Sequence, residues 1–215
     1  MMASLATPFP CPSCQTPLVF RTEVSLAQVC PSCLSVVRKT MVPGAVPQKA
    51  VPMREVMSII QIGMTGTRAG DKFEVIGRIQ YFFLEGYRNH WFVLYESGLT
   101  GWLGDWAGNY CFFQESSYTG HSPVGSLCIG DTATIGAVIL SIEVKDKVKQ
   151  IFWEGEVPEQ GLQELGFASI ELFRTDGQMG ILQVTNSRVP HAYLGSYVEL
   201  NEMSLQGTRT HDEWL

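Results

Sequence analysis

The amino-acid sequence predicts an all-β protein in which a small cysteine-rich module precedes an antiparallel β-barrel or β-sandwich. Three observations support this prediction. The 215 residues are 45% apolar and 11% aromatic but only 17% charged, which indicates a packed core rather than disorder. Paired cysteines near the N-terminus are typical of a module held by a metal. Beyond residue 55, short runs of Val, Ile, Phe, Tyr and Trp alternate with Gly, Asp, Asn and Ser, as antiparallel strands and turns require.

Four cysteines form the strongest chemical pattern in the chain. Cys11 and Cys14 are separated by Pro-Ser, and Cys30 and Cys33 are separated by the same dipeptide. Two residues between cysteines make a tight knuckle that brings both sulfurs to one ion, and two knuckles complete a tetrahedron. We therefore predict one structural Zn²⁺ bound by these four side chains. A redox pair or disulfides are the alternative, which a reducing compartment disfavours.

Residues 11–40 resemble the rubredoxin-like and ribosomal zinc ribbons, in which a short hairpin joins the two knuckles. Here the hairpin is expected from Pro17–Phe20 and Leu26–Val29. Such ribbons often place Gly after each knuckle to permit a left-handed backbone, whereas this chain has Gln15 and Leu34 there. Iron also binds four thiolates, but zinc is the expected metal for this spacing.

Composition divides the chain into three parts. We predict a zinc ribbon over residues 1–40, a linker over 41–54 and an all-β domain over 55–215. Three prolines and a glycine occur among residues 41–53, and neither a helical nor a strand period runs through them. That composition is typical of a semi-extended linker.

Apolar alternation locates the strands of the larger domain. The strand over Lys72–Leu84 is expected to bury one apolar face, from Phe73 to Phe83. The strand over Thr132–Val144 is apolar on both faces, which predicts a central strand bent at Gly136. The remaining predicted strands are Trp91–Tyr95, Gly101–Leu103, Tyr110–Gln114, Gln150–Trp153, Ile170–Arg174, Gly180–Val184 and Tyr197–Leu200. Gln160–Leu165 is the one predicted helical turn.

Two pairs of segments repeat in the same order along the domain. Ile60–Thr67 resembles Leu127–Thr134, and Phe92–Leu103 resembles Ile170–Leu182 with a one-residue insertion. Two similar halves facing each other would produce this pattern. The alternative is that β-meanders share turn residues by chance.

Several short segments of residues 61–200 resemble domain-of-unknown-function family 4178, an uncharacterised bacterial family. They are Gly77-Arg78-Ile79-Gln80-Tyr81, Trp91, Leu94-Tyr95, Gly101-Trp102-Leu103 and Gly155-Glu156-Val157-Pro158. The resemblance implies a β-rich module, often preceded by a zinc ribbon, with no established activity. It also implies a link to envelope-stress or polyamine-related gene clusters, and hence association with a membrane-stress complex. The family's usual carboxylate after the Trp is replaced here by Phe92.

Charge is distributed unevenly along the chain. Residues 1–54 contain five Lys and Arg against one Glu, whereas residues 55–215 contain ten Lys and Arg against twenty Asp and Glu. The net charge of −10 on the larger part disfavours nucleic acid as its partner. No apolar run reaches the roughly 20 residues of a transmembrane helix, and residues 1–10 lack the features of a signal peptide. We therefore expect a cytoplasmic protein.

No set of residues in the sequence predicts a catalytic site. Cys111 and Cys128 lie singly in apolar surroundings and are expected to be buried, inert thiols. The histidines share no metal-ligand spacing and are expected near loops or termini, as surface or capping residues; they are His90, His121, His191 and His211. A protein without catalytic activity is therefore expected, and an enzyme whose site is scattered along the sequence is the alternative.

A group of aromatic and acidic residues is the other candidate site. Aromatic faces attract ammonium groups and carboxylates add complementary charge, so these residues could form a cage for a cationic ligand. The alternative is that the tryptophans belong to the core. The cage would consist of Trp91, Trp102, Trp153, Asp105, Glu154 and Glu156, with Trp106 nearby.

Together these patterns predict a binding or scaffold protein whose acidic β domain binds another protein or a cationic small molecule. The first rival is the enzyme just described. The second is a zinc-ribbon nucleic-acid adaptor, which only the basic residues of the N-terminal part favour: Arg21, Arg38, Lys39 and Lys49.

Overall fold

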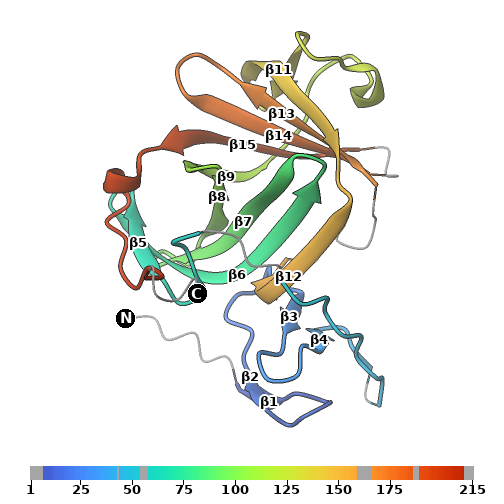
Figure 1. Ribbon diagram of the computed structural model, residues 1–215, viewed down its shortest axis with the longest axis vertical. Coiled ribbons are helices and arrows are strands. Elements are labelled where there is room, and N and C mark those ends of the chain that lie inside the picture. Colours follow the sequence, from blue (N-terminus) through green and yellow to red (C-terminus); the bar gives the residue numbers. More distant parts are fainter. Residues whose placement is uncertain (1–6, 43, 54–57, 159–165, 186–188, 211–215) are drawn as a thin grey trace.

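The computed structural model confirms an all-β chain, built from one small sheet and one large antiparallel sheet (Figure 1). Within the described part of the chain, the helical segments are the 3₁₀ turns Val124–Ser126 and Leu200–Glu202. No helix there is long and apolar enough to cross a membrane. The structure describes residues 7–42, 44–53, 58–158, 166–185 and 189–210.

The small sheet pairs β1 (Phe9–Pro10) with β2 (Pro17–Leu18). The expected hairpin between Pro17–Phe20 and Leu26–Val29 is therefore wrong, since Ala27–Val29 pairs instead with Val36–Arg38, so that each knuckle has a hairpin of its own. The strands of the large sheet are β3 (Ala27–Val29), β4 (Val36–Arg38), β5 (Thr65–Arg68), β6 (Asp71–Phe83), β7 (Gly86–Tyr95), β8 (Thr100–Trp106), β9 (Asn109–Ser116), β10 (Thr132–Ile135), β11 (Val138–Lys147), β12 (Gln150–Val157), β13 (Ala168–Phe173), β14 (Gln178–Val184) and β15 (His191–Val198).

The large sheet is folded over on itself but is not closed into a barrel. Its strand order is β10-β11-β13-β14-β15-β9-β8-β7-β6-β12-β3-β4, with β5 paired to β6 beside this path. The end strands β10 and β4 do not pair with each other. In Figure 1, the strands β11 and β13–β15 form an upper layer, and β6–β9 with β12 form a lower one.

Buried side chains of the described residues form four clusters. The central core combines residues of both layers: Ile79, Tyr81, Phe92, Trp102, Phe113, Met179, Ile181 and Tyr193, among others. One outer core lies on the other face of β6–β9 and includes Ile60, Met64, Val75, Trp91, Leu103, Phe112 and Met203. A second outer core lies on the other face of the upper layer and includes Val124, Leu127, Leu140, Ile142, Ile170 and Leu182. A small fourth cluster surrounds the N-terminal cysteines.

The predicted repeat is present in the hydrogen bonds of the two halves. The Gly63 N–H donates to the Val75 carbonyl in the first half, and the Gly130 N–H donates to the Ile142 carbonyl in the second. Each long strand then carries a bulge at the equivalent place, after Val75 in β6 and after Ile142 in β11. A bulge inserts an extra residue and bends its strand, so both halves turn in the same way.

The hairpins that follow these bulges are also equivalent. The β7–β8 loop and the β13–β14 loop each contain a glycine in the left-handed region, Gly98 with φ +86° and Gly177 with φ +85°. The last strands of the two halves, β9 and β15, pair side by side, and the equivalent residues Gln114 and Leu194 lie directly opposite each other. A pseudo-twofold axis therefore passes through this pair and relates the two halves.

Two of the predicted strands differ from the observed ones. The segment Thr132–Val144 is a hairpin rather than one bent strand, because Gly136 adopts φ +59° and reverses the chain between β10 and β11. Tyr197–Leu200 covers only the end of β15 and the start of a 3₁₀ turn. The predicted helical turn at Gln160–Leu165 lies outside the described residues.

The bulge in β6 also changes the predicted apolar face. Phe73 and Val75 point into the outer core, whereas Ile79 and Tyr81 point into the central core. An uninterrupted strand would keep all four on one face, since side chains alternate with a period of two. The bulge after Val75 shifts this alternation, and it places Arg78 among buried residues.

The ribbon continues the large sheet. Strand β12 pairs with β6 as far as the Gly155–Gly77 pair and then pairs with β3, where Val157 lies opposite Ala27. Part of the predicted linker is folded onto the second knuckle, since Lys49 forms a β-bridge with Ser35. The ribbon and the larger domain therefore share one sheet.

We predict that replacing Gly77 by Ala destabilises the protein strongly. A Cβ atom at Gly77 would lie 1.6 Å from the carbonyl oxygen of Glu156, so β12 would have to move away from β6. We expect a loss of about 2–4 kcal/mol in the free energy of unfolding, measured by urea denaturation. The control is Gly125→Ala, since Gly125 has no atom within 4 Å of the added Cβ; its stability should change by less than about 0.5 kcal/mol. Equal stability of the two variants would contradict the close approach.

Candidate functional site

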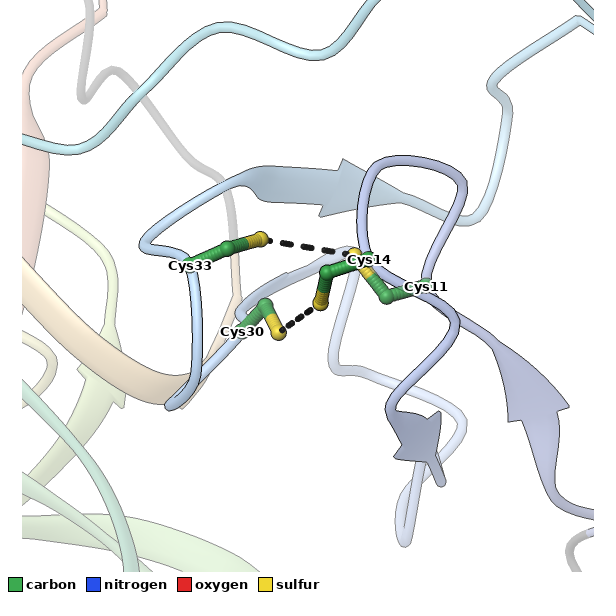
Figure 2. Close-up of side chains that lie close together, drawn as sticks. All are labelled: Cys11, Cys14, Cys30 and Cys33. Carbon is green, nitrogen blue, oxygen red and sulfur yellow. Dashed lines mark hydrogen bonds between the residues drawn. The ribbon is translucent and has the colours of Figure 1, made fainter.

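The four predicted cysteines meet at one point and could hold a metal ion. The Cys11 and Cys33 sulfurs lie 3.7 Å apart, and the Cys14 and Cys30 sulfurs lie 3.6 Å apart (Figure 2). All four sulfurs lie within 4.8 Å of one another. Four ligands at about 2.3 Å from a tetrahedral ion would be separated by about 3.8 Å, so this arrangement fits the ion with little movement. The four residues are free thiols rather than disulfides.

The two knuckles have the same backbone geometry. The Gln15 N–H donates to the Cys11 carbonyl at 2.9 Å, and the Leu34 N–H donates to the Cys30 carbonyl at 2.8 Å. Gln15 and Leu34 have φ values of +64° and +58°. The chain thus adopts the left-handed turn that glycine usually supplies, at a cost of about 1–2 kcal/mol per residue.

Hydroxyl groups support two of the sulfurs. The Thr16 hydroxyl lies 3.3 Å from the Cys14 sulfur, and the Ser35 hydroxyl lies 3.2 Å from the Cys33 sulfur. These contacts and the neighbouring backbone N–H groups lower the pKa of Cys14, and they lower the pKa of Cys33 to about 6. Burial instead raises the pKa of Cys30 to about 11. Thr16 and Ser35 each follow the second cysteine of a knuckle by two residues, and this shared offset is the sequence signal that could have identified them.

Lys49 adds a positive charge beside the cluster. Its ammonium donates to the Cys33 carbonyl at 2.6 Å and to the Ser35 hydroxyl at 3.0 Å. Four thiolates and a divalent ion carry a net charge of −2, which a nearby ammonium stabilises. Lys49 comes from the predicted linker, so sequence spacing alone did not connect it with the knuckles.

Other basic side chains of the N-terminal part also have partners within the chain. Arg21 forms a bidentate pair with Glu74 of β6, with both N···O distances at 2.6 Å. The Lys39 ammonium donates to the carbonyls of Thr22 and Glu23. These groups hold the ribbon together and join it to the sheet.

The predicted aromatic cage is not assembled as one site. Trp91 is buried in the outer core, whereas Trp102 lies in the central core on the opposite face of the sheet. The guanidinium of Arg78 lies 4.4 Å from the centre of the Trp91 ring and pairs with Glu154 at 3.5 Å. Trp153 packs half-buried against the central core.

The two buried carboxylates of the predicted cage have structural partners. Asp105 accepts hydrogen bonds from Ser58 at 2.5 Å and from Asn89 at 3.4 Å. Glu156 accepts the Arg21 N–H at 2.8 Å where β12 meets the ribbon. Burial raises the pKa of both carboxyl groups. The six predicted residues therefore do not form one site. Trp91, Asp105 and Glu154 lie around Arg78, whereas Trp102, Trp153 and Glu156 lie elsewhere. Ligand binding by any of them stays a prediction.

Two of the expected burial states are wrong. His90 lies inside β7 in the central core, edge-on to Tyr81 and Phe113, rather than near a loop. Cys128 is exposed in a turn, whereas Cys111 is buried as expected. His211 lies outside the described residues. The alternation of β7 could have signalled the burial of His90, since it shares a sheet face with Phe92.

No protein-family model, curated protein or solved structure matches this chain.

We predict that replacing Lys49 by Met weakens metal binding about tenfold, because the carbonyl and hydroxyl next to Cys33 lose their charged donor. The measurement is competition for the metal with a chromogenic chelator. The control is Lys149→Met, which removes an exposed lysine in the β11–β12 turn. Equal affinity in the two variants would mean that Lys49 does not stabilise the cluster.

We also predict a pH-dependent stability from His90. Burial, aided by the charge of Arg88, lowers the pKa of His90 to about 3, whereas an unfolded histidine has a pKa of about 6.5. Between these values the unfolded chain binds a proton that the folded chain does not, so stability falls as the pH is lowered.

Urea denaturation at pH 7 and pH 4.5 measures this effect. His90→Phe should lose less stability on acidification than the wild type, by up to about 1.4 kcal/mol per pH unit. His121→Gln, in an exposed loop, should behave like the wild type. The prediction fails if His90→Phe and the wild type respond to pH identically.

Proposed function

We propose that this protein is a non-catalytic binding scaffold in which one structural Zn²⁺ fixes the N-terminal ribbon against the large sheet. The observation that carries the proposal is the meeting of four thiols, with Cys14–Cys30 and Cys11–Cys33 sulfur separations of 3.6 and 3.7 Å. They lie in a ribbon whose β3–β4 hairpin continues the large sheet through β12. Cys11, Cys14, Cys30 and Cys33 would hold the ion. Zinc supplies no redox chemistry at such a site, and its bonds contribute folding free energy.

A structural role is favoured over a catalytic one by the number of ligands. Four cysteines fill a tetrahedral site and leave no position for water or substrate. The surroundings of the sulfurs point the same way. Contacts with Thr16 and Ser35 lower the pKa of Cys14 and Cys33, and the Lys49 ammonium donates to the Ser35 hydroxyl beside Cys33. Zinc rather than iron remains part of the proposal, because this donor set accepts both metals.

The contacts of the β domain support binding rather than catalysis. Asp105 and Glu156 are occupied by hydrogen bonds within the chain, and His90 is enclosed by aromatic rings. The acidic charge of residues 55–215 supports a basic protein or a cationic small molecule as the partner. Membership of domain-of-unknown-function family 4178 belongs to the same proposal and rests only on the resemblance of short sequence segments such as Gly77–Tyr81 and Gly155–Pro158.

Metal analysis tests the proposal. The purified chain should contain one zinc per molecule by elemental analysis, and Cys14→Ser should lose most of it, because three ligands bind far more weakly than four. The matched control is Cys128→Ser, which removes an exposed cysteine far from the cluster in sequence and should keep full zinc content. Stoichiometric iron would refute zinc, and a disulfide or the absence of metal in a chain purified without chelators would refute the structural site.

A further inference from the structure

A small pocket opens at one end of the central core. It has a volume of about 140 Å³, and four of its lining side chains are aromatic. These rings come from four different strands: Tyr81 from β6, Phe92 from β7, Trp102 from β8 and Tyr193 from β15. Glu115 of β9 also lines the pocket. The pocket thus joins both layers of the sheet.

The aromatic walls are fixed by their own packing. Each of the four rings belongs to a residue that is less than one-tenth exposed. The Phe92 and Trp102 ring centres lie 5.0 Å apart, and Tyr193 packs edge-on against Phe113 at 5.7 Å. Walls that are already ordered lose little entropy when a ligand enters.

The charge of the pocket favours a cation. Glu115 lies directly opposite Tyr193 in the β9–β15 ladder and is exposed at the pocket. No Lys, Arg or His is found among the described residues that line the pocket. Burial raises the pKa of Tyr81 to about 12 and also raises that of Tyr193, so both phenols stay neutral near pH 7. The negative faces of aromatic rings and one carboxylate attract cations and repel anions.

The chain itself uses the same chemistry at two other places. The Arg78 guanidinium lies 4.4 Å from the ring centre of Trp91 and pairs with Glu154. The Arg88 guanidinium lies 4.6 Å from the ring centre of Phe83 and pairs with a glutamate of β13. In both places a cation of the chain contacts both an aromatic ring and a carboxylate. The pocket offers the same combination, and none of the cation–ring contacts found in the described residues involves its four rings.

We propose that this pocket binds a small organic cation carrying an alkylammonium or quaternary ammonium group. The inference rests on the binding function proposed above and names its ligand class. A volume of about 140 Å³ is the share of about five water molecules in the liquid, which admits a small amine but no nucleotide or folded partner. Among the residues of the cage predicted from the sequence, only Trp102 lines this pocket. Its carboxylate comes from Glu115 rather than from Asp105, Glu154 or Glu156.

Titration of the metal-loaded chain with tetramethylammonium tests the proposal. Binding is followed by tryptophan fluorescence and by saturation-transfer NMR. The neutral comparison is tert-butanol, which has a similar size and shape without the charge. We expect saturable binding of tetramethylammonium and at least tenfold weaker binding of tert-butanol, because only the cation interacts with the ring faces and Glu115. Absent binding of tetramethylammonium, or equal binding of the two probes, would overturn the proposal.

Substitutions at Glu115 locate the binding. Because its side chain is exposed, Glu115→Gln should fold normally and bind tetramethylammonium about three- to fivefold more weakly. Glu115→Lys should abolish binding, since its own ammonium repels the probe and can enter the pocket. The control is Glu143→Gln, an exposed glutamate of β11 that does not line the pocket.

Unchanged affinity in Glu115→Lys would place the binding elsewhere and overturn the assignment. Metal content measured on the same samples separates this failure from a failure of the zinc scaffold.

Discussion

The arrangement of the whole molecule depends on the close approach of two backbones, at Gly77 of β6 and Gly155 of β12. The two residues are paired in the ladder, and side chains are excluded there by neighbouring carbonyl groups. This contact lets β12 run along β6 and then pass onto β3 of the ribbon. At its other end, β12 begins after a turn in which the Val148 N–H donates to the Phe167 carbonyl and the Lys149 N–H donates to the Phe82 carbonyl. One strand therefore connects the ribbon and both halves of the domain.

The same connection changes what the metal has to stabilise. A segment of about 30 residues buries too little apolar surface to fold alone, so zinc ribbons generally depend on their ion. Here Ala27, Val29 and Val36 of the β3–β4 hairpin are buried in the central core of the larger domain. The opposite side of the ribbon has its own small core, in which Leu18 and Val37 pack beside the cysteines. Metal binding orders the knuckles, while the large sheet holds the hairpin, so the two contributions stabilise different faces of the same small unit.

Local patterns in the sequence were sufficient for features that depend on local geometry. The spacing of Cys11 and Cys14 predicts their shared site, because a knuckle is formed by adjacent residues. Features set by distant strands were not predictable in this way. The bulge after Val75 has its effect through β7 and β12, and Arg78, which follows it, is buried although it alternates with the apolar residues of the strand. His90 is buried because the second half of the domain packs over it. Its alternation with Phe92 indicates a shared face but not which distant strands cover that face.

The repeat explains why one core has two chemically different ends. In the structure Phe92 is equivalent to Glu171, because Phe92 pairs with Trp102 just as Glu171 pairs with Ile181. The sequence alignment of Phe92 with Ile170 is therefore wrong by one residue, and no insertion is needed. The pseudo-twofold axis exchanges the two ends of the central core, so these positions face opposite ends. In the second half the carboxylate of Glu171 pairs with Arg88, and this ion pair lies at one end of the core. At the equivalent place in the first half, the aromatic ring of Phe92 lines the pocket. The difference between Glu171 and Phe92 thus accompanies an internal cation at one end of the core and an aromatic pocket at the other.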